Sequence, residues 1–322
     1  ASTEIVHDRA NLEVFRGCIR GCRFCQAGMV YRPIREKSPE TLSKLAKCLY
    51  ENTGYDEISL ISLSISDYSE LRELTDRLLE WTDDEHVSLS LPSLRVDSFS
   101  DELMKRVSSV RTGGLTFAPE AGTQRLRDVI NKNVTEEDLM RSASIAFGSG
   151  KEQVKLYFMN GLPTETDDDV LGIADVGEKI LDTYFSKKRP VKGIQISMSV
   201  SCFVPKPFTP FQWEGQNSVE EFQRKQQLLK NAIRSRKITY KYHDAKTSAI
   251  EAVFARGNRK VGKALEIACE KGVRLDSWDE YFDYEKWLST FDEAGIDPKF
   301  FTERKIPFEE VLPWDHISAL VS

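Results

Sequence analysis

Alternating apolar and polar residues in the segment from Gly193 to Ser201 constrain the fold more than any other feature of the sequence. The apolar members share one face of an extended strand and are Ile194, Ile196, Met198 and Val200. The polar members share the opposite face and are Gln195, Ser197, Ser199 and Ser201. Because side chains alternate between the two faces of a strand, one face is expected to pack on helices and the other to border water.

The same alternation recurs in the segments 87–91 and 153–159, and further extended runs lie between helical runs. The predicted strands are residues 12–15, 57–66, 87–91, 114–117, 153–159 and 193–201. The predicted helices are residues 39–51, 69–81, 101–107, 167–184, 219–236 and 261–271. A strand followed by a helix, repeated about six times, predicts an α/β fold with a parallel sheet or barrel.

The polar strand faces indicate which kind of barrel to expect. A closed eight-stranded barrel fills its interior with bulky branched side chains, and strands buried on both faces read as continuous apolar runs. We therefore expect an open barrel of about six strands around a polar cavity, formed by residues 1–213. Residues 214–322 are expected to form an α-rich extension that covers the barrel or docks a partner. A sheet with one solvated face is the alternative.

Three of the six cysteines, Cys18, Cys22 and Cys25, follow the pattern C-x-x-x-C-x-x-C near the start of the chain. Gly17 and Gly21 permit positive φ angles and a close approach of the backbone to a bound group. A structural zinc site normally has four Cys or His ligands, and no fourth lies close in the sequence. A 4Fe-4S cluster is usually held by four cysteines, so three would leave one iron open to another ligand. The spacing alone leaves both metal centres open.

The pattern C-x-x-x-C-x-aromatic-C, with Phe24 as the aromatic residue, resembles the signature of the radical S-adenosylmethionine (radical SAM) superfamily. The longer run from Arg16 to Glu36 resembles one branch whose members often carry an N-terminal cobalamin-binding-type domain. The resemblance implies a partial (β/α)6 TIM-like barrel and a 4Fe-4S cluster held by the three cysteines. It also implies that the cluster cleaves SAM to a 5′-deoxyadenosyl radical, which abstracts hydrogen from a substrate.

The resemblance also suggests contacts to SAM in the loops that follow the strands. The candidate cofactor-binding residues are Phe24, Ser66, Asp67, Tyr68, Arg95, Glu120, Gly161 and Leu162. Asp67 could pair with the ammonium group of SAM, Arg95 with a carboxylate, and Glu120 with the ribose hydroxyls. The turn at Gly161 and Leu162 resembles one whose backbone contacts adenine. The stretch Ser66–Tyr68 departs from the family's Gly-Gly-Glu pattern, and Ser66 or Asp67 could instead cap the next helix.

The composition of the chain limits the kinds of partner that we expect it to bind. The net charge of −6 gives no general attraction to nucleic acid or to an anionic membrane. No run approaches the roughly 18 apolar residues of a membrane span, and no signal segment opens the chain, so we expect a cytoplasmic protein. The expected partners are SAM, an external electron donor and an unknown substrate, which could be RNA, protein or a small molecule.

Two other classes of function remain open. One is a cobalamin-dependent or methylthio-type transferase that modifies RNA or protein and has a further domain, with cobalamin bound on a domain outside this chain. The other is a non-catalytic iron–sulfur or zinc module that docks a partner.

Overall fold

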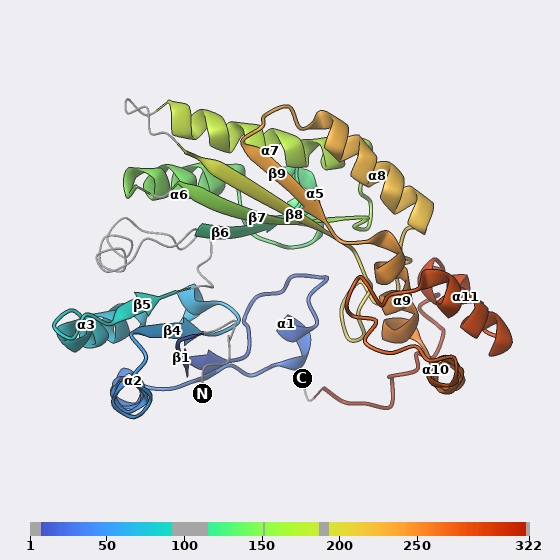
Figure 1. Ribbon diagram of the computed structural model, residues 1–322, viewed down its shortest axis with the longest axis horizontal. Coiled ribbons are helices and arrows are strands. Elements are labelled where there is room, and N and C mark those ends of the chain that lie inside the picture. Colours follow the sequence, from blue (N-terminus) through green and yellow to red (C-terminus); the bar gives the residue numbers. More distant parts are fainter. Residues whose placement is uncertain (1–7, 92–114, 151, 187–192, 320–322) are drawn as a thin grey trace.

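The computed structural model describes residues 8–91, 115–150, 152–186 and 193–319. Two parallel sheets and their covering helices make up most of this part of the chain, and a group of helices follows them (Figure 1). The predicted α/β class with parallel strands and a helical C-terminal part is confirmed. Among the described residues, no helix has the length and apolar character needed to cross a membrane.

The first sheet contains the strands β1, β4 and β5 in that order, all parallel. The strands are β1 (Ala10–Glu13), β4 (Glu57–Ile61) and β5 (Ser88–Ser90). Helices α2 (Pro39–Thr53) and α3 (Leu71–Thr82) pack on one face through a shared apolar core. The hydroxyl of Ser38 accepts a hydrogen bond from the N–H of Thr41, so α2 begins with the expected cap.

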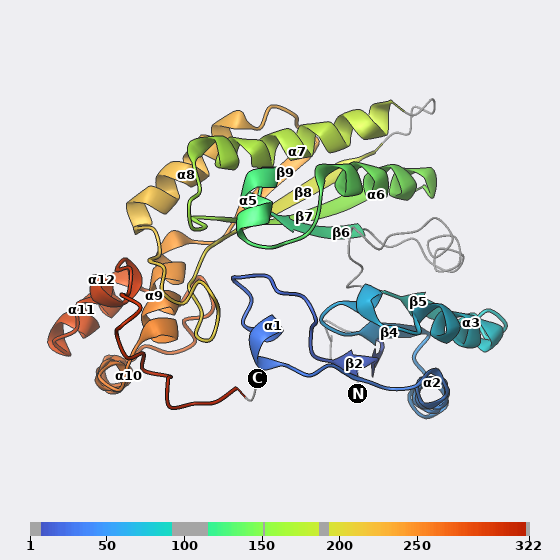
Figure 2. The same ribbon diagram turned by 180° about the vertical axis from the view of Figure 1, so that it is seen from behind.

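The second sheet contains β6, β7, β8 and β9 in that order, also parallel. The strands are β6 (Leu115–Glu120), β7 (Gln153–Asn160), β8 (Gln195–Cys202) and β9 (Ile238–Tyr242). The helices between them are α5 (Gln124–Val129), α6 (Glu136–Gly148), α7 (Asp167–Phe185) and α8 (Val219–Ala232). Helices α6, α7 and α8 cover one face of the sheet (Figures 1 and 2).

The predicted division of β7 and β8 into two faces is confirmed. Ile196, Met198 and Val200 are at most 1% exposed and lie in the core beneath the covering helices. Tyr157, on the opposite face of β7, is 43% exposed. This polar face is turned away from α6 and α7, toward the first sheet and the cysteine-bearing segment (Figure 2).

Several predicted boundaries were wrong. Strand β4 ends at Ile61 instead of residue 66, because its partner β1 ends at Glu13, with which Ile61 pairs. A short 3-10 helix, η1 (Ile65–Asp67), follows. Helix α8 ends at Ala232 instead of residue 236, because Ile233 takes an extended conformation that leads into β9. The helix predicted at residues 101–107 lies outside the described residues.

Two features were missing from the sequence prediction. Strand β9 pairs in parallel with β8, with Ile238 beside Ile196, and extends the second sheet by one strand. Strands β2 (Phe15–Arg16) and β3 (Arg35–Glu36) form an antiparallel pair that brackets the three cysteines. Strand β9 lies within residues 214–322, which were predicted to form the α-rich extension. The division of the chain into two domains at residue 213 stays a prediction.

The C-terminal helices are α9 (Ala245–Arg256), α10 (Val261–Glu270), α11 (Tyr284–Glu293) and α12 (Pro298–Thr302). They share an apolar core that includes Trp287 and Phe291. The buried Gln216 side chain donates hydrogen bonds to the carbonyl oxygens of Phe203 (3.0 Å) and Ser248 (3.1 Å). The start of α9 is thereby attached to the segment that leaves β8.

Candidate functional site

The cysteine loop, residues 17–26, leaves strand β2 through a backbone turn that only glycine accommodates. Gly17 has φ +103°, and a Cβ atom there would lie 2.6 Å from the carbonyl oxygen of Tyr31. The backbone N–H of Cys18 donates to the same oxygen over 3.3 Å. Helix α1 (Ala27–Val30) follows the loop, and Arg32 closes it by donating to the carbonyl oxygens of Arg20 and Gly28.

Residues from the second half of the barrel hold the cysteine loop in place. The backbone N–H of Arg23 donates to the carbonyl oxygen of Ile130 over 3.0 Å, just after α5. The side-chain amide of Asn131 donates to the carbonyl oxygen of Gly21 over 2.8 Å. Gln26 reaches the carbonyl oxygen of Pro207, in the segment after β8, over 3.3 Å. The shape of the loop therefore depends on segments more than 100 residues downstream in the sequence.

None of the three predicted cysteine ligands forms a disulfide; Cys22 is buried, and Cys18 and Cys25 are half-buried. The backbone N–H of Arg20 points at the sulfur of Cys18 over 3.4 Å. Within the described ranges, no group of three His, Cys, Asp or Glu side chains lies close enough together to hold a single metal ion. The thiolates of a 4Fe-4S cluster bind separate irons, so its three cysteine ligands do not have to converge on a single metal ion.

The cysteine Cys202, at the end of β8, differs from these three. Burial raises the pKa of its thiol to about 11, and Gln226 donates to its sulfur over 3.6 Å. At neutral pH this group stays a protonated thiol, which is not the form that binds metals.

The predicted SAM residue Asp67 is joined to the cysteine loop. Both oxygens of its carboxylate accept hydrogen bonds from the guanidinium of Arg20, one of them over 2.9 Å. The Asp67 side chain is only 4% exposed, and that of Arg20 is 27% exposed. This bidentate pair connects the segment after β4 with the middle of the cysteine loop.

Breaking this pair should destabilise the fold in a way that depends on both partners. We expect Asp67→Asn and Arg20→Gln to lower the free energy of unfolding, with a coupling energy of about 1–3 kcal/mol in a double-mutant cycle. Because the pair is partly shielded from water, its coupling energy should exceed that of an exposed ion pair. Urea unfolding of the two single variants and the double variant measures the coupling. Additive effects would show that the contact carries no interaction energy.

The neighbouring predicted residue Tyr68 is 3% exposed and stacks against Phe15. Its hydroxyl donates to the carbonyl oxygen of Lys37 over 2.7 Å. Burial, with nearby carboxylates, raises the pKa of this phenol to about 12. The side chain of Tyr68 is therefore occupied within the fold, whereas the neighbouring Ser66 is half-buried.

Glu120 ends strand β6 at an irregular position. The register of β6 against β7 shifts between Phe117 and Glu120, and Glu120 takes a left-handed φ of +66°. Non-glycine residues held in this conformation cluster at functional sites. Its carboxylate pairs with Lys132 over 3.0 Å, and both side chains are at most 16% exposed. The predicted residue Arg95 lies outside the described residues.

The predicted turn after β7 is tightly constrained. Gly161 has φ +78°, and a Cβ atom there would lie 2.4 Å from the ring of Phe222. The next residue, Leu162, is 3% exposed and belongs to an apolar cluster against which the predicted Phe24 packs. The structure thus brings together Phe24 and Leu162, which are far apart in the sequence.

Two buried charges behind this turn were missed by the sequence analysis. The ammonium of Lys225, on α8, lies 2.9 Å from the carboxylate of Glu165, and their side chains are 6% and 1% exposed. Lys225 also donates to Asn217 over 2.9 Å, and the N–H of Gly161 donates to Glu165 over 2.7 Å. Burial raises the pKa of Glu165, while the Lys225 ammonium opposes that effect. No sequence pattern connects two charges 60 residues apart.

A third missed residue is Asn160, the last residue of β7. It is 1% exposed, and its side-chain oxygen has no hydrogen-bond partner among the described residues. A buried acceptor left without a donor is costly. Its place at the carboxyl end of a barrel strand is where ligands bind in such folds.

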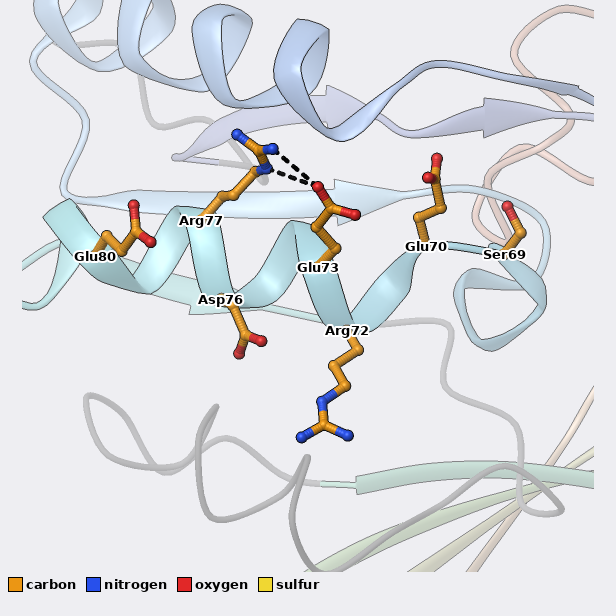
Figure 3. Close-up of a pocket in the computed structure, with 7 residues that line it drawn as sticks. All are labelled: Ser69, Glu70, Arg72, Glu73, Asp76, Arg77 and Glu80. Atoms are coloured by element: carbon orange, nitrogen blue, oxygen red, sulfur yellow. Dashed lines mark hydrogen bonds and ion pairs between the residues drawn. The ribbon is translucent and has the colours of Figure 1, made fainter.

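A shallow depression on α3 lies apart from these residues. It is lined by Ser69, Glu70, Arg72, Glu73, Asp76, Arg77 and Glu80 (Figure 3). Arg77 pairs with Glu73 over 2.9 Å within the same helix. None of the predicted site residues lines this depression.

Comparison with known proteins identifies the family to which this chain belongs. Residues 12–176, half of the chain, match the family described as the radical SAM superfamily. The chain therefore belongs to the radical SAM superfamily. Membership implies an enzyme that uses a 4Fe-4S cluster and SAM as cofactors.

Two curated relatives come from Methanocaldococcus jannaschii. "Uncharacterized protein MJ0966" is 33% identical over 289 residues, which cover 88% of this chain and 60% of that protein. "Putative methylthiotransferase MJ0865" is 25% identical over 191 residues, which cover 56% of this chain and 42% of that protein. The chain thus spans less than two thirds of the length of either relative.

The fold is similar to that of a solved radical SAM methyltransferase, TsrM from Kitasatospora setae with tryptophan and a SAM analogue bound. The TM-score is 0.50 at 13% identity, covering 64% of this chain and 38% of that chain. At this identity the likeness concerns the fold alone.

Proposed function

We propose that this chain is the SAM-cleaving part of a radical SAM enzyme, with Cys18, Cys22 and Cys25 as the ligands of its 4Fe-4S cluster. The observation that carries the proposal is the cysteine loop, in which three thiols outside any disulfide lie between β2 and α1 and the N–H of Arg20 points at the sulfur of Cys18. When bound, the reduced cluster supplies the electron that cleaves SAM to methionine and a 5′-deoxyadenosyl radical, which takes hydrogen from the substrate. An external donor provides that electron.

The surroundings of the loop fit this cofactor pair. Orphaned buried acceptors are satisfied by ligands or water, and the side-chain oxygen of Asn160 is such an acceptor. The backbone N–H groups of the loop and its arginines suit a cluster that carries negative charge. Cys202 would remain a protonated thiol and so would not bind iron. This agrees with a cluster that is held by three cysteine thiolates.

The protein's own residues would orient SAM. The turn at Gly161 and Leu162 offers backbone groups to adenine, with Phe24 packed behind it, and the ion pair of Glu165 and Lys225 fixes the shape of that turn. Glu120 offers a carboxylate to the ribose hydroxyls at the end of β6. Arg20 holds Asp67 against the cysteine loop, so Asp67 acts on the cofactor site through this pair as well as by any contact with the SAM ammonium.

A second candidate is transfer of a methyl or methylthio group by the whole protein. The relative named "Putative methylthiotransferase MJ0865" favours it. Either reaction would use further domains, which for a cobalamin-dependent methyl transfer include a cobalamin-binding one, and the chain spans only part of its relatives' length. In this case residues 1–213 would still make the radical, and residues 214–322 would cover the barrel or contact RNA or protein.

Reductive cleavage of SAM tests the proposal. The chain is loaded with iron and sulfide under anaerobic conditions, reduced with dithionite and incubated with SAM. We expect about four irons and four sulfides per chain, and 5′-deoxyadenosine that forms only with reductant. A cluster-loaded sample that yields none would overturn the proposal, and zinc in place of iron and sulfide would favour a structural module. S-adenosylhomocysteine formed beside 5′-deoxyadenosine would support the second candidate.

A further inference from the structure

The polar face of the second sheet carries two lysines on the strands that flank β8. Lys155 of β7 pairs in register with Ser197, and Lys241 of β9 pairs with Ser199. Neighbouring strands are about 4.8 Å apart, so β7 and β9 are separated by about 10 Å. Both ammonium groups stand on flexible four-carbon stems and can reach over the serines between them.

The charge of this face is unbalanced. The positions of β7, β8 and β9 that share it are Gln153, Lys155, Tyr157, Met159, Gln195, Ser197, Ser199, Ser201, Thr239 and Lys241. Lysine supplies all the formal charge in this set, in a chain whose net charge is −6. The face is therefore locally positive and rich in hydroxyl donors.

Neither Lys155 nor Lys241 has a hydrogen-bond or ion-pair partner within the described ranges, and both are exposed. On the helical side of the same sheet, by contrast, Lys179 pairs with Glu136 and Lys225 with Glu165. Two unpaired cations on one face repel each other, and an anion placed between them relieves that repulsion.

We propose that Lys155 and Lys241, with the hydroxyls of Ser197, Ser199 and Tyr157, bind an anionic group of the substrate, either a carboxylate or a phosphate. This inference rests on the proposed function and adds to it that the substrate is held beside this face. The ammonium groups supply the charge, and the serine and tyrosine hydroxyls supply hydrogen bonds to the anion's oxygens. The enzyme thus selects an acidic substrate and holds it by its charged end.

The first test locates the bound anion on the cluster-loaded chain. Lysine acetylation is followed residue by residue by mass spectrometry, with inorganic phosphate in one arm and succinate in the other. At ten times the dissociation constant, we expect acetylation of Lys155 and Lys241 to slow about tenfold in at least one arm. Lys230, exposed on α8 on the other side of the sheet, should react at an unchanged rate. Equal rates with and without both anions would overturn the proposal.

The second test measures affinity by titration calorimetry at constant ionic strength. The variant Lys155→Met/Lys241→Met should bind the preferred anion at least about tenfold more weakly than the natural protein, a loss of about 1.4 kcal/mol. Lys230→Met should bind it normally. Unchanged affinity in the double variant would place the anion elsewhere. SAM cleavage by the natural protein without substrate is measured separately, so a failure of the anion site and a failure of the proposed function give different results.

Discussion

Replacing Cys22 with alanine should abolish cluster binding and the formation of 5′-deoxyadenosine. Cys22 is the buried member of the three thiols, and its loss leaves two ligands for a cluster that already has one open iron. The loss of affinity should exceed the roughly 10- to 100-fold that removal of an outer-shell partner costs. Iron and sulfide analysis after anaerobic loading measures it, and Cys18→Ala and Cys25→Ala should behave in the same way.

The matched controls are Cys48→Ala and Cys269→Ala, which remove exposed cysteines from α2 and α10. Both should retain iron, sulfide and SAM cleavage. Circular dichroism should show that Cys22→Ala keeps its secondary structure, because Cys22 lies in a loop, outside the helices and strands. A Cys22→Ala protein that still binds a full cluster would contradict the ligand assignment.

Removing the ammonium of Lys225 should destabilise the protein by about 3–5 kcal/mol. Lys225→Met leaves the carboxylate of Glu165 buried without its counter-charge, at a side-chain exposure of 1%. The double variant Glu165→Gln/Lys225→Met should recover part of the loss, because it removes the uncompensated charge. Urea unfolding measures these differences, and Lys230→Met on the same helix should change stability little.

The deficit of Lys225→Met should depend on pH. Burial raises the pKa of Glu165, and Lys225→Met removes the positive charge that opposes this effect. A carboxyl whose folded pKa lies above its unfolded pKa stabilises the fold below the unfolded pKa, and this stability is lost as the pH rises through the folded value. The deficit should therefore be small in acid and grow toward neutral pH. A deficit independent of pH would show that lost packing, not the buried charge, is responsible.

Elements with strong periodicity were predictable from the sequence. The alternation in β8 correctly assigned Ile196 and Met198 to the helix-covered face, because a strand buried on one side must separate its apolar and polar residues. The short strand β9 was missed, since its sequence from Ile238 follows a basic stretch that resembles a helix end. Its pairing with β8 is a tertiary contact that local preference does not encode.

Site residues that lie close together in the sequence could be predicted from it. Those that come together only in the folded chain could not. The spacing of Cys18, Cys22 and Cys25 identified the candidate metal ligands. The pair of Arg20 with Asp67 joins residues 47 apart, and the contact of Asn131 with Gly21 joins residues 110 apart. Only the folded chain brings such partners together, so no spacing rule could have named them.

The contacts that hold the cysteine loop bear on when a cluster can be inserted. Arg23 is held by Ile130, Gly21 by Asn131 and Gln26 by Pro207, which are all synthesised long after the cysteines. In a nascent chain that has formed only its first sheet, the loop is held by Asp67 and Arg32 but lacks these three later contacts. The arrangement seen here is complete only once the second sheet has folded, so under the proposed function we expect the cluster to be inserted after the chain has folded.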